Sequence, residues 1–574
     1  MFRLPINGLM DDERGRFLDA LRSIVGTRGI LVNARETARF RTGIRYGLGA
    51  ALAVVRPNTL VRLWRVVRAC IIADKIVIMQ AANTGLTGGS TPFGDTYDRD
   101  VVIINTSCIG KIHVIENGRQ VICLAGATLF ELENALAPLG REPHSVIGSS
   151  CIGASVIGGV CNNSGGALVR RGPAFTQMAL YARVDEDGTL RLVNHLEVNL
   201  GADPEVILDR LERGDFSASD IEHDPLRVGA DHDYARRVRD TDADEPARFN
   251  ANLRGLYEAS GSAGKLVIFA VRLDTFRKAH QTRVFYIGSN DPRELTNIRR
   301  HVLKSFKSLP ILGEYIHRDA YNLAEVYGKD TFLAIKILGV SRLPQLFRLK
   351  DRVDQLALRL GFRSSSTSAS ILHRLAQMCR HHLPTRMNEF RDRFEHHLIV
   401  KASEEGIAEA IQYFGRIFPS GSGDFFECTE EEAQKALLHR FVVAGAAIRY
   451  RAMHDDTVED IVALDVALKR NEVNWFNSLP AELDKKIMHK SIYGHFFCHV
   501  FHQDYVVAKG HDLTDVKGRL LADLDSKGAE YPAEHNVGHL YAAKPTLASF
   551  YRYLDPCNAL NPGIGHTSRR RHWL

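Results

Sequence analysis

Apolar residues recur along this chain with two periods, one typical of strands and one typical of helices. Short apolar runs predict strands at residues 76–79, 101–104 and 121–124, and a hairpin over 181–193. Helical spacing predicts three helices. The first covers 18–25, the second begins after the capping pair Asn58-Thr59, and the third covers 130–139 and ends at Gly140. This alternation predicts an α/β arrangement for the first third of the chain.

The same patterns continue into a second region. Strands are predicted at 265–273, 283–289 and 397–401, and helices begin at Asp291-Pro292 and at Thr429, where Glu432 completes a capping box. Residues 215–252 are rich in charge and poor in apolar side chains, which predicts an excursion on the surface. Since 574 residues are too many for one hydrophobic core, we expect an α+β protein with α/β segments and two or three domains.

Composition narrows the class of protein. The chain has 45% hydrophobic and 25% charged residues, and its net charge of 74 − 68 = +6 is only mildly basic. We find no secretory signal, no apolar run of roughly 18–20 residues and no CxxC pair among the nine cysteines. We therefore expect reduced thiols and a cytoplasmic location. No nucleic-acid-reading module is recognisable, so nucleic-acid binding is not expected.

Two glycine-rich segments are the main candidates for cofactor binding. The first, Ala81 to Ser90, directly follows a predicted strand, and the second runs from Gly148 to Gly166. Glycine permits positive φ and close approach of a ligand, and successive N–H groups can then cradle a diphosphate. Neither segment is a GxxxxGK[ST] loop or a GxGxxG turn opening a helix. The alternative is tight packing of small residues in turns.

The stretch from residue 341 to 393 combines basic and apolar side chains. This stretch contains eleven arginines and lysines but only four acidic residues, and leucines and phenylalanines are interleaved at helical spacing. This pattern is typical of a helix that lies in a membrane interface. A basic, solvated face on a packed helix gives the same pattern, and both interpretations stay open.

A few histidines stand out among the 24 in the chain. His495 and His502 are separated by seven positions, and Glu534 is followed at once by His535. Imidazole and carboxylate are suitable ligands for a divalent metal, and a neutral histidine can take a proton from a hydroxyl group. Spacing alone does not separate these roles from ordinary surface or core positions.

Together these segments resemble the vanillyl-alcohol-oxidase-like FAD proteins. The two glycine-rich loops resemble the flavin-cradling loops of that superfamily, Glu534 to Gly538 resembles its EHGxG motif, and residues 560–563 match its terminal LNPG. Residues 141–155, 501–505 and 531–541 resemble the quinone-dependent D-lactate dehydrogenases more closely still. The resemblance extends over nearly the whole chain and is weakest at residues 341–370.

The resemblance implies an FAD-binding domain (1–272 and 520–574), an α+β cap or substrate domain (273–315 and 392–519) and a basic membrane-binding segment (316–391). It implies non-covalent FAD, D-lactate as substrate, a membrane quinone as acceptor, and peripheral attachment to anionic phospholipid on the cytoplasmic face of a bacterial inner membrane. The implied flavin contacts are Ala81, Ala82, Asn83, Thr84, Gly85, Gly89, Ser90, Gly148, Ser155, Gly165 and Ile268. The implied catalytic base is His535.

Relatives that act on D-2-hydroxyglutarate hold zinc with positions matching His495, His502 and Glu534. Here residues 496–501 and Asn536 depart from that pattern, so a divalent metal such as zinc is an expectation only. Candidate cations for the substrate carboxylate are Arg386, Arg391 and Lys401. Two alternatives stay open: a dehydrogenase of a larger D-2-hydroxy acid such as D-2-hydroxyglutarate, and a membrane-associated FAD-binding protein without activity.

Overall fold

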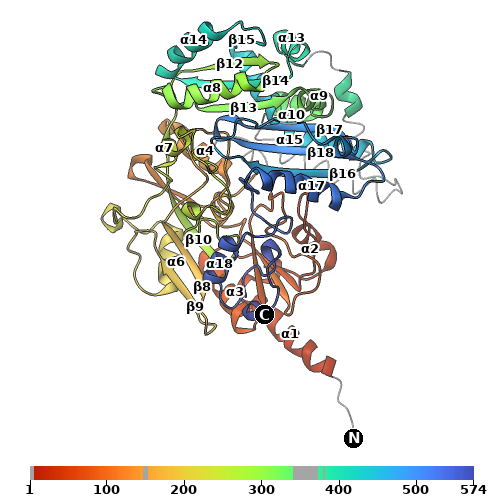
Figure 1. Ribbon diagram of the computed structural model, residues 1–574. Coiled ribbons are helices and arrows are strands. Elements are labelled where there is room, and N and C mark those ends of the chain that lie inside the picture. The colour runs from red at the N-terminus through yellow and green to blue at the C-terminus, as the bar shows by residue number, and fades with distance from the viewer. Residues whose placement is uncertain (1–5, 146–152, 340–372, 379–381, 477) are drawn as a thin grey trace.

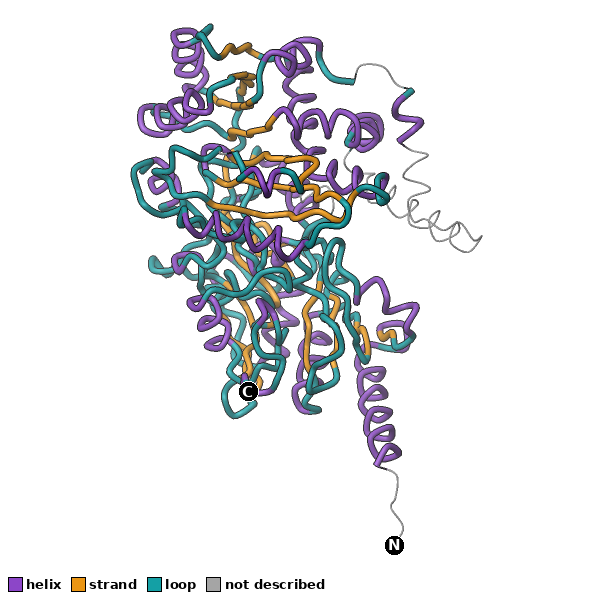
Figure 2. The backbone as a smooth tube through the Cα atoms, turned by 45° about the vertical axis from the view of Figure 1, so that its right-hand side comes forward, coloured by secondary structure: helices purple, strands orange, loops and turns teal. Residues whose placement is uncertain are grey.

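The chain folds into a lower and an upper lobe, each built on β-sheet (Figure 1). The computed structural model describes residues 6–145, 153–339, 373–378, 382–476 and 478–574. The N-terminal helix α1 (Ile6–Val25) extends from the lower lobe in both views of the backbone (Figures 1 and 2). Its inner end packs on helix α3 (Leu60–Ile72), which Thr59 caps as predicted.

The first sheet of the lower lobe contains the strand that leads into the first glycine-rich segment. Its order is β1-β2-β4-β3, and β2, β4 and β3 are parallel. Their nearly unbroken apolar sequences agree with burial on both faces. The elements are β1 (Ile30–Leu31), α2 (Ala34–Arg41), β2 (Ala53–Val55), β3 (Ile76–Gln80) and β4 (Val101–Asn105). The strands predicted at 76–79 and 101–104 are thus confirmed.

A second sheet of the lower lobe is antiparallel and has the order β5-β6-β10-β8-β9. It packs against the first sheet through a shared hydrophobic core. The predicted hairpin is formed by β8 and β9, and the predicted helix before Gly140 is α4 with one further 3₁₀ turn. The elements are β5 (Ile112–Ile115), β6 (Gln120–Leu124), α4 (Leu129–Leu136), β7 (Arg141–Glu142), α5 (Val156–Cys161), β8 (Ala179–Val184), β9 (Leu190–Asn194), α6 (Pro204–Arg213), α7 (Tyr234–Arg239), β10 (Val267–Asp274) and β11 (Phe276–Arg277).

The upper lobe is one antiparallel sheet of seven strands in the order β15-β12-β14-β13-β17-β18-β16. Alternate side chains of each strand enter separate hydrophobic clusters on the two faces. The strands are β12 (Thr282–Ser289), β13 (Leu312–His317), β14 (His396–Ser403), β15 (Gly423–Glu427), β16 (Val458–Ala467), β17 (Ile487–His495) and β18 (Val500–Ala508).

Helices cover both faces of this upper sheet (Figure 1). One face carries α9 (Arg318–Tyr327), α10 (Lys329–Leu338), α13 (Thr385–Arg393) and α15 (Glu430–Met453). The other carries α8 (Pro292–Ser305), α14 (Glu405–Ile417), α16 (Ala481–Asp484) and α17 (Leu513–Ser526). The predicted caps of α8 and α15, Asp291 and the Thr429–Glu432 box, are both formed.

After the upper sheet the chain returns to the lower lobe. Helix α18 (Pro545–Leu554) precedes a bridge between Leu560 and Val77 of β3. Asn561 donates its side-chain amide to the Gly89 carbonyl at 2.9 Å. The closing LNPG segment therefore packs on the first glycine-rich loop and holds it through this hydrogen bond.

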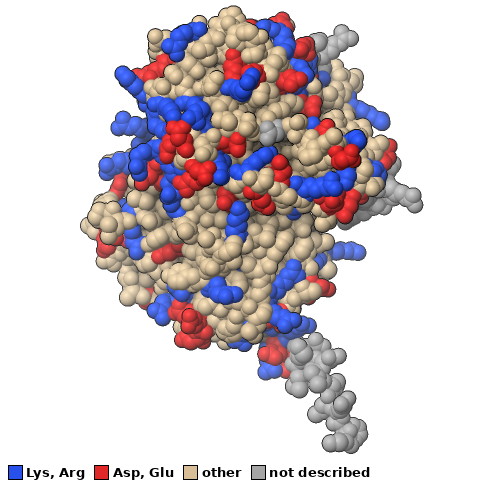
Figure 3. Space-filling model, in the orientation of Figure 1, with Lys and Arg blue, Asp and Glu red and all other residues tan. Residues whose placement is uncertain are grey.

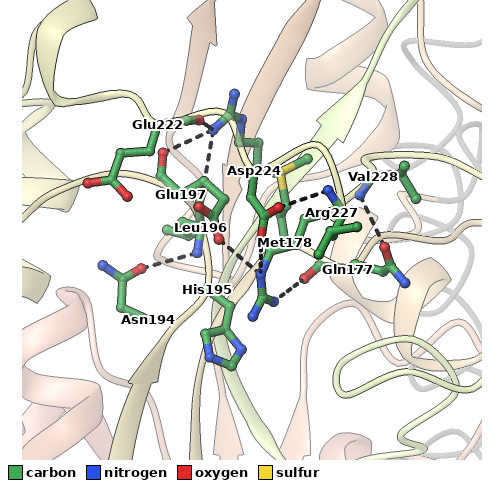
Figure 4. A network of polar contacts seen from close by, with 12 residues as sticks. Gln177, Met178, Asn194, His195, Leu196, Glu197, Glu222, Asp224, Arg227 and Val228 are labelled. Atoms are coloured by element: carbon green, nitrogen blue, oxygen red, sulfur yellow. Dashed lines mark hydrogen bonds and ion pairs between the residues drawn. The ribbon is translucent and has the colours of Figure 1, made fainter.

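The charge-rich segment 215–252 is more buried than its composition predicted. Arg227 forms ion pairs with Glu197 and Asp224 and donates to the Gln177 carbonyl, which fixes the start of the segment against the lower lobe (Figure 4). Further along, Arg248 is fully buried. The expectation of a surface excursion is therefore wrong for this part, because a buried carboxylate described below compensates the arginine charge.

Charged side chains of both signs gather over the upper lobe on the face seen in Figure 3. Within the described ranges, we find no helix that is both long and apolar enough to cross a bilayer. Of the basic and apolar stretch 341–393, residues 341–372 and 379–381 lie outside the described residues; α10 precedes this stretch, residues 373–378 lie within it and α13 ends it.

Candidate active site

A cavity of about 1850 Å³ reaches from the glycine-rich loops of the lower lobe to the upper sheet. Predicted flavin contacts on its wall are Ala81, Ala82, Asn83, Thr84, Gly85, Gly89, Ser90, Ser155, Gly165 and Ile268. Gly148 lies outside the described residues. Because ligand sites commonly have volumes of about 300–1000 Å³, the cavity has room for more than one ligand.

The first loop has an open backbone that suits a diphosphate. Asn83 and Gly88 adopt positive φ, and the Asn83 side chain bonds the Thr42 carbonyl at 2.9 Å. From Ala82 to Ser90, no backbone N–H donates to any group that the structure describes. A Cβ on Gly85 would meet nothing within 4 Å, so there is free space beside this backbone. The loop therefore fits the phosphate groups of FAD.

The second loop approaches the reaction centre. Ser155 caps α5 by accepting from Gly158 N at 3.1 Å. A Cβ on Gly165 would lie 2.5 Å from Cδ of Glu534, so glycine is needed there. Asn536 donates to Oδ1 of Asn162 at 2.6 Å. The asparagine that departs from the EHGxG pattern thus joins the second loop to the Glu534–His535 segment.

Strand register brings the other polar residues of the site together. Glu314 on β13 lies opposite His495 on β17, and Asp465 on β16 lies opposite His502 on β18. Residues 496–499 form a tight turn that ends with His499 at positive φ. The unusual sequence between the two histidines therefore forms a hairpin turn, and the histidines remain close together.

His495, His502 and Glu534 each offer a ligand atom within 4.8 Å of the others. His495 lies between two carboxylates, with Nδ1 2.7 Å from Glu314 and Nε2 3.3 Å from Glu534. Burial opposes its charge, but the two carboxylates prevail and raise the pKa of His495 to about 10. Glu534 also pairs with buried Arg248; burial opposes its charge too, yet Arg248 and His495 lower the pKa of Glu534 to about 2.

His535 faces the same cavity and is held by Asp465. The Asp465 carboxylate lies 3.0 Å from Nδ1 of His535, and it accepts from the backbone N–H groups of Glu534 and His535 at 2.7 and 3.1 Å. Burial works against the imidazolium, but Asp465 outweighs it and raises the pKa of His535. The interaction at Nδ1 leaves Nε2 as the atom that can accept a proton.

The structure separates the three predicted carboxylate-binding cations. Lys401 on β14 lines the cavity, and burial lowers its pKa. Arg386 and Arg391 are outside the cavity wall: Arg386 pairs with Glu432, and Arg391 pairs with Glu325 and Asp392. The structure does not bring these two arginines to His535.

Sequence reasoning missed several residues of the site. Arg45 lines the cavity, donates to the Ala444 carbonyl at 2.8 Å and has no carboxylate partner among the residues that the structure describes. The cluster of His495, His502 and Glu534 is supported by Glu314 and Arg248, and His535 is supported by Asp465. None of them lies in a recognisable motif. The available signal is that Glu314 and Asp465 are buried carboxylates with apolar neighbours in their strands.

Comparisons with known proteins agree with this architecture. A family model described as "D-lactate dehydrogenase, membrane binding" matches residues 284–573, and one described as "FAD binding domain" matches 51–194. The quinone-dependent D-lactate dehydrogenase of Escherichia coli is 55% identical over 97% of both chains. That of Haemophilus influenzae is 55% identical over 97% of this chain and 99% of its own, and that of Corynebacterium glutamicum is 46% identical over 97% of both.

Solved structures show the fold. A p-cresol methylhydroxylase has a TM-score of 0.57 at 12% identity and covers 97% of both chains. A 4-ethylphenol oxidase from Gulosibacter chungangensis has a TM-score of 0.55 at 10% identity, covering 96% of this chain and 97% of its own. The expected α+β fold of the vanillyl-alcohol-oxidase type is therefore confirmed. With more than half of its length matched by the membrane-binding model and with these relatives, the chain belongs to the family of quinone-dependent D-lactate dehydrogenases.

Proposed function

We propose that this protein oxidises D-lactate to pyruvate and passes the two electrons through FAD to a membrane quinone. The observation that carries the proposal is the position of His535, whose imidazole is fixed by Asp465 on the wall of the cavity that contains the cofactor loops. The names of the three relatives that match 97% of this chain support the same substrate and acceptor.

His535 is the proposed base for the substrate hydroxyl. A hydride leaves the α-carbon easily only as the oxygen loses its proton, so a base must accept that proton in the transition state. Nε2 of His535 takes this role, while Asp465 holds the ring and stabilises the imidazolium that forms. FAD, when bound, supplies the hydride acceptor. The lactate carbon loses two electrons, the hydroxyl loses one proton, and pyruvate results.

We assign His495, His502 and Glu534 to a divalent cation such as zinc. Two imidazoles and a carboxylate are a suitable donor set, and Nδ1 of each histidine contacts a second carboxylate: Glu314 for His495 at 2.7 Å, Asp465 for His502 at 3.3 Å. In the absence of an ion, a proton on His495 balances Glu534; a cation would replace that proton. Bound there, the cation would orient and polarise the substrate hydroxyl.

The substrate carboxylate needs a cation on the cavity wall. Lys401 and Arg45 both lie there, whereas Arg386 and Arg391 are already paired with acidic side chains elsewhere. We assign the carboxylate to Arg45, because it lies on the cavity wall within electrostatic range of His535 and makes no ion pair with any described carboxylate. We expect Arg45→Gln to raise the KM for D-lactate at least tenfold and Lys401→Gln to change it less. The reverse order in steady-state kinetics would transfer the role to Lys401.

The basic stretch is proposed to hold the protein on anionic phospholipid at the cytoplasmic face of the membrane. Each basic residue near such a surface contributes about 1 kcal/mol, and salt screens the attraction. Arg348, Lys350 and Arg352 lie outside the described residues, but their charges follow from the sequence. We expect their joint change to glutamine, or high salt, to release protein from anionic vesicles in a flotation assay. Retention under both conditions would contradict an electrostatic attachment.

Anaerobic reduction of the bound flavin tests the function directly. We expect D-lactate to bleach the yellow protein, L-lactate to fail, and D-2-hydroxyglutarate to react with a lower kcat/KM. A higher kcat/KM for the dicarboxylate would replace lactate by a larger D-2-hydroxy acid. No bleaching by any hydroxy acid would leave an FAD-binding protein without this activity. Repeating the series after chelator treatment tests the cation assignment.

A further inference from the structure

Helix α15 is apolar on two neighbouring sides: one is buried in the core of the upper lobe, and the other lies at the edge of that core. Ala436, Val443, Ala447 and Tyr450 are buried against α9 and the upper sheet. A second apolar stripe, about a third of a turn away, is only partly buried among the described residues and lines the cavity: Leu437, Phe441, Ala444, Gly445 and Ile448. Its spacing of three and four residues places these side chains on one side of the helix.

This apolar stripe begins beside the reaction centre. Arg440 lies 2.8 Å from Glu314, the carboxylate that holds His495, and the Ala444 carbonyl one turn further accepts from Arg45. From Phe441 to Ile448 the helix advances about 10 Å at 1.5 Å per residue. The stripe therefore forms an apolar wall that leads outward from the catalytic groups within the same cavity.

The outer end of this wall meets α9 and α10, the two helices that precede the basic stretch 341–393. Arg449 pairs with Asp330 of α10 at 2.7 Å, and Tyr327, Thr331 and Ile335 line the cavity there. Helix α10 is followed directly by the basic sequence from residue 340. Exposed apolar side chains lie on described elements before and within this stretch: Val326, Ile337, Leu375 and Met378. Gln377 donates to the Val326 carbonyl at 3.0 Å, so residues 373–378 lie against α9.

We infer that the apolar stripe of α15, with the cavity-facing side of α9 and α10, binds the ring and first isoprenoid units of the quinone. An apolar surface that the described residues cover only in part is costly in water, and an apolar ligand bound on it removes that cost. The cavity volume also exceeds the space that one ligand requires. A lipid-soluble acceptor entering from the bilayer would meet α9 and α10, the two helices that precede the basic stretch.

This inference rests on the proposed function, because it specifies where the second substrate of that reaction binds. The quinone gains two electrons and two protons: the α-hydride of D-lactate supplies both electrons and one proton, and the hydroxyl supplies the other proton through His535. D-lactate and quinone thus become pyruvate and quinol, with no other oxidant. The site explains how a water-soluble donor and a lipid-soluble acceptor can use one cofactor from different sides of one cavity.

Substitutions on α15 separate quinone binding from lactate oxidation. We expect Phe441→Gln and Ile448→Gln each to raise the KM for decylubiquinone in detergent at least tenfold. Anaerobic flavin reduction by D-lactate and turnover with the water-soluble dye dichlorophenolindophenol should stay within twofold of wild type. The matched control is Ile411→Gln on α14: Ile411 is 47% exposed and Ile448 39%, but only Ile448 lines the cavity. Quinone kinetics equal to those of this control in both variants would overturn the inference.

A second measurement uses the unmodified holoenzyme. We expect a photoreactive azido-quinone to label peptides from α15, α9 or α10, and excess decylubiquinone to prevent the labelling. Competable labelling confined to other parts of the chain would also overturn the quinone site. If D-lactate does not reduce the wild-type flavin at all, the proposed function fails instead, and that result is independent of either quinone experiment.

Discussion

The two ends of the cavity are built by different means. At the lower end, the first glycine-rich loop presents backbone N–H groups that make no hydrogen bond to described residues. At the upper end, side chains from four strands and one loop converge, and charge compensates charge: Glu314, Asp465, His495, His502, Glu534 and His535. One site depends on the local shape of the chain, the other on strand register.

This difference determines how each end should respond to mutation. A backbone cradle is disturbed by adding atoms, because the groups that bind cannot be removed by substitution. A side-chain cluster is disturbed by removing one partner, because each buried charge then loses its compensation. Substitutions at four positions test whether the two ends are as separate as the geometry indicates.

The largest effect is expected from the base at the upper end. We expect His535→Ala to keep its FAD and to slow flavin reduction by D-lactate about 10²–10⁴-fold, the usual contribution of a general base. Stopped-flow spectroscopy under anaerobic conditions measures this rate. His223→Ala, which changes an exposed histidine paired with Glu116 in the lower lobe, is the matched control. Reduction at the wild-type rate would remove His535 from the reaction.

The same contrast explains how much could be predicted from the sequence. The first loop was recognisable because its information is local: a buried strand ends at Gln80, and turn-forming residues follow. The resemblance supplied His495, His502, Glu534 and His535 as residue types. Their partners could not be predicted, since Glu314 precedes His495 by 181 positions and only the β13–β17 register makes them neighbours.

Predictions from composition were wrong where the charge of an arginine is compensated by a carboxylate far away in the sequence. Arg248 lies in a polar stretch, yet it is buried because Glu534 pairs with it. Arg386 and Arg391 had the right chemistry for a carboxylate site, but Glu432 and Glu325 already pair with them. Glu432 also completes the cap of α15, so one residue serves both contacts. A sequence shows that a cation is present but not whether its charge is free.

A smaller effect is expected when a supporting carboxylate is neutralised. Glu314→Gln removes the charge that holds both His495 and Arg440, and loss of such a partner typically costs about 10–100-fold in metal affinity or activity. We expect lower metal content by elemental analysis and slower flavin reduction, with partial recovery in Glu314→Asp. Glu395→Gln, which changes an exposed carboxylate paired with Arg318, is the control. Wild-type metal content and rate in Glu314→Gln would show that the cluster does not depend on this carboxylate.

The smallest effects separate the two ends by adding a single methyl group. At Gly85 a Cβ meets no protein atom within 4 Å, so Gly85→Ala should fold normally and reduce only the space left for FAD. We expect about tenfold weaker FAD binding in a fluorescence titration, equivalent to ~1.4 kcal/mol, with an unchanged Tm of the apoprotein. Gly415→Ala on α14, also without a neighbour within 4 Å, is the control.

At Gly165 the same methyl group would reach Glu534 instead, at 2.5 Å from Cδ. Because Glu534 contacts Arg248 and His495, its displacement should slow flavin reduction more than it weakens FAD binding. Gly85→Ala should show the opposite ratio of the two effects. If both variants lost FAD affinity and reduction rate in the same proportion, the cradle and the side-chain cluster would have to be treated as one coupled site, with Gly165 transmitting strain between them.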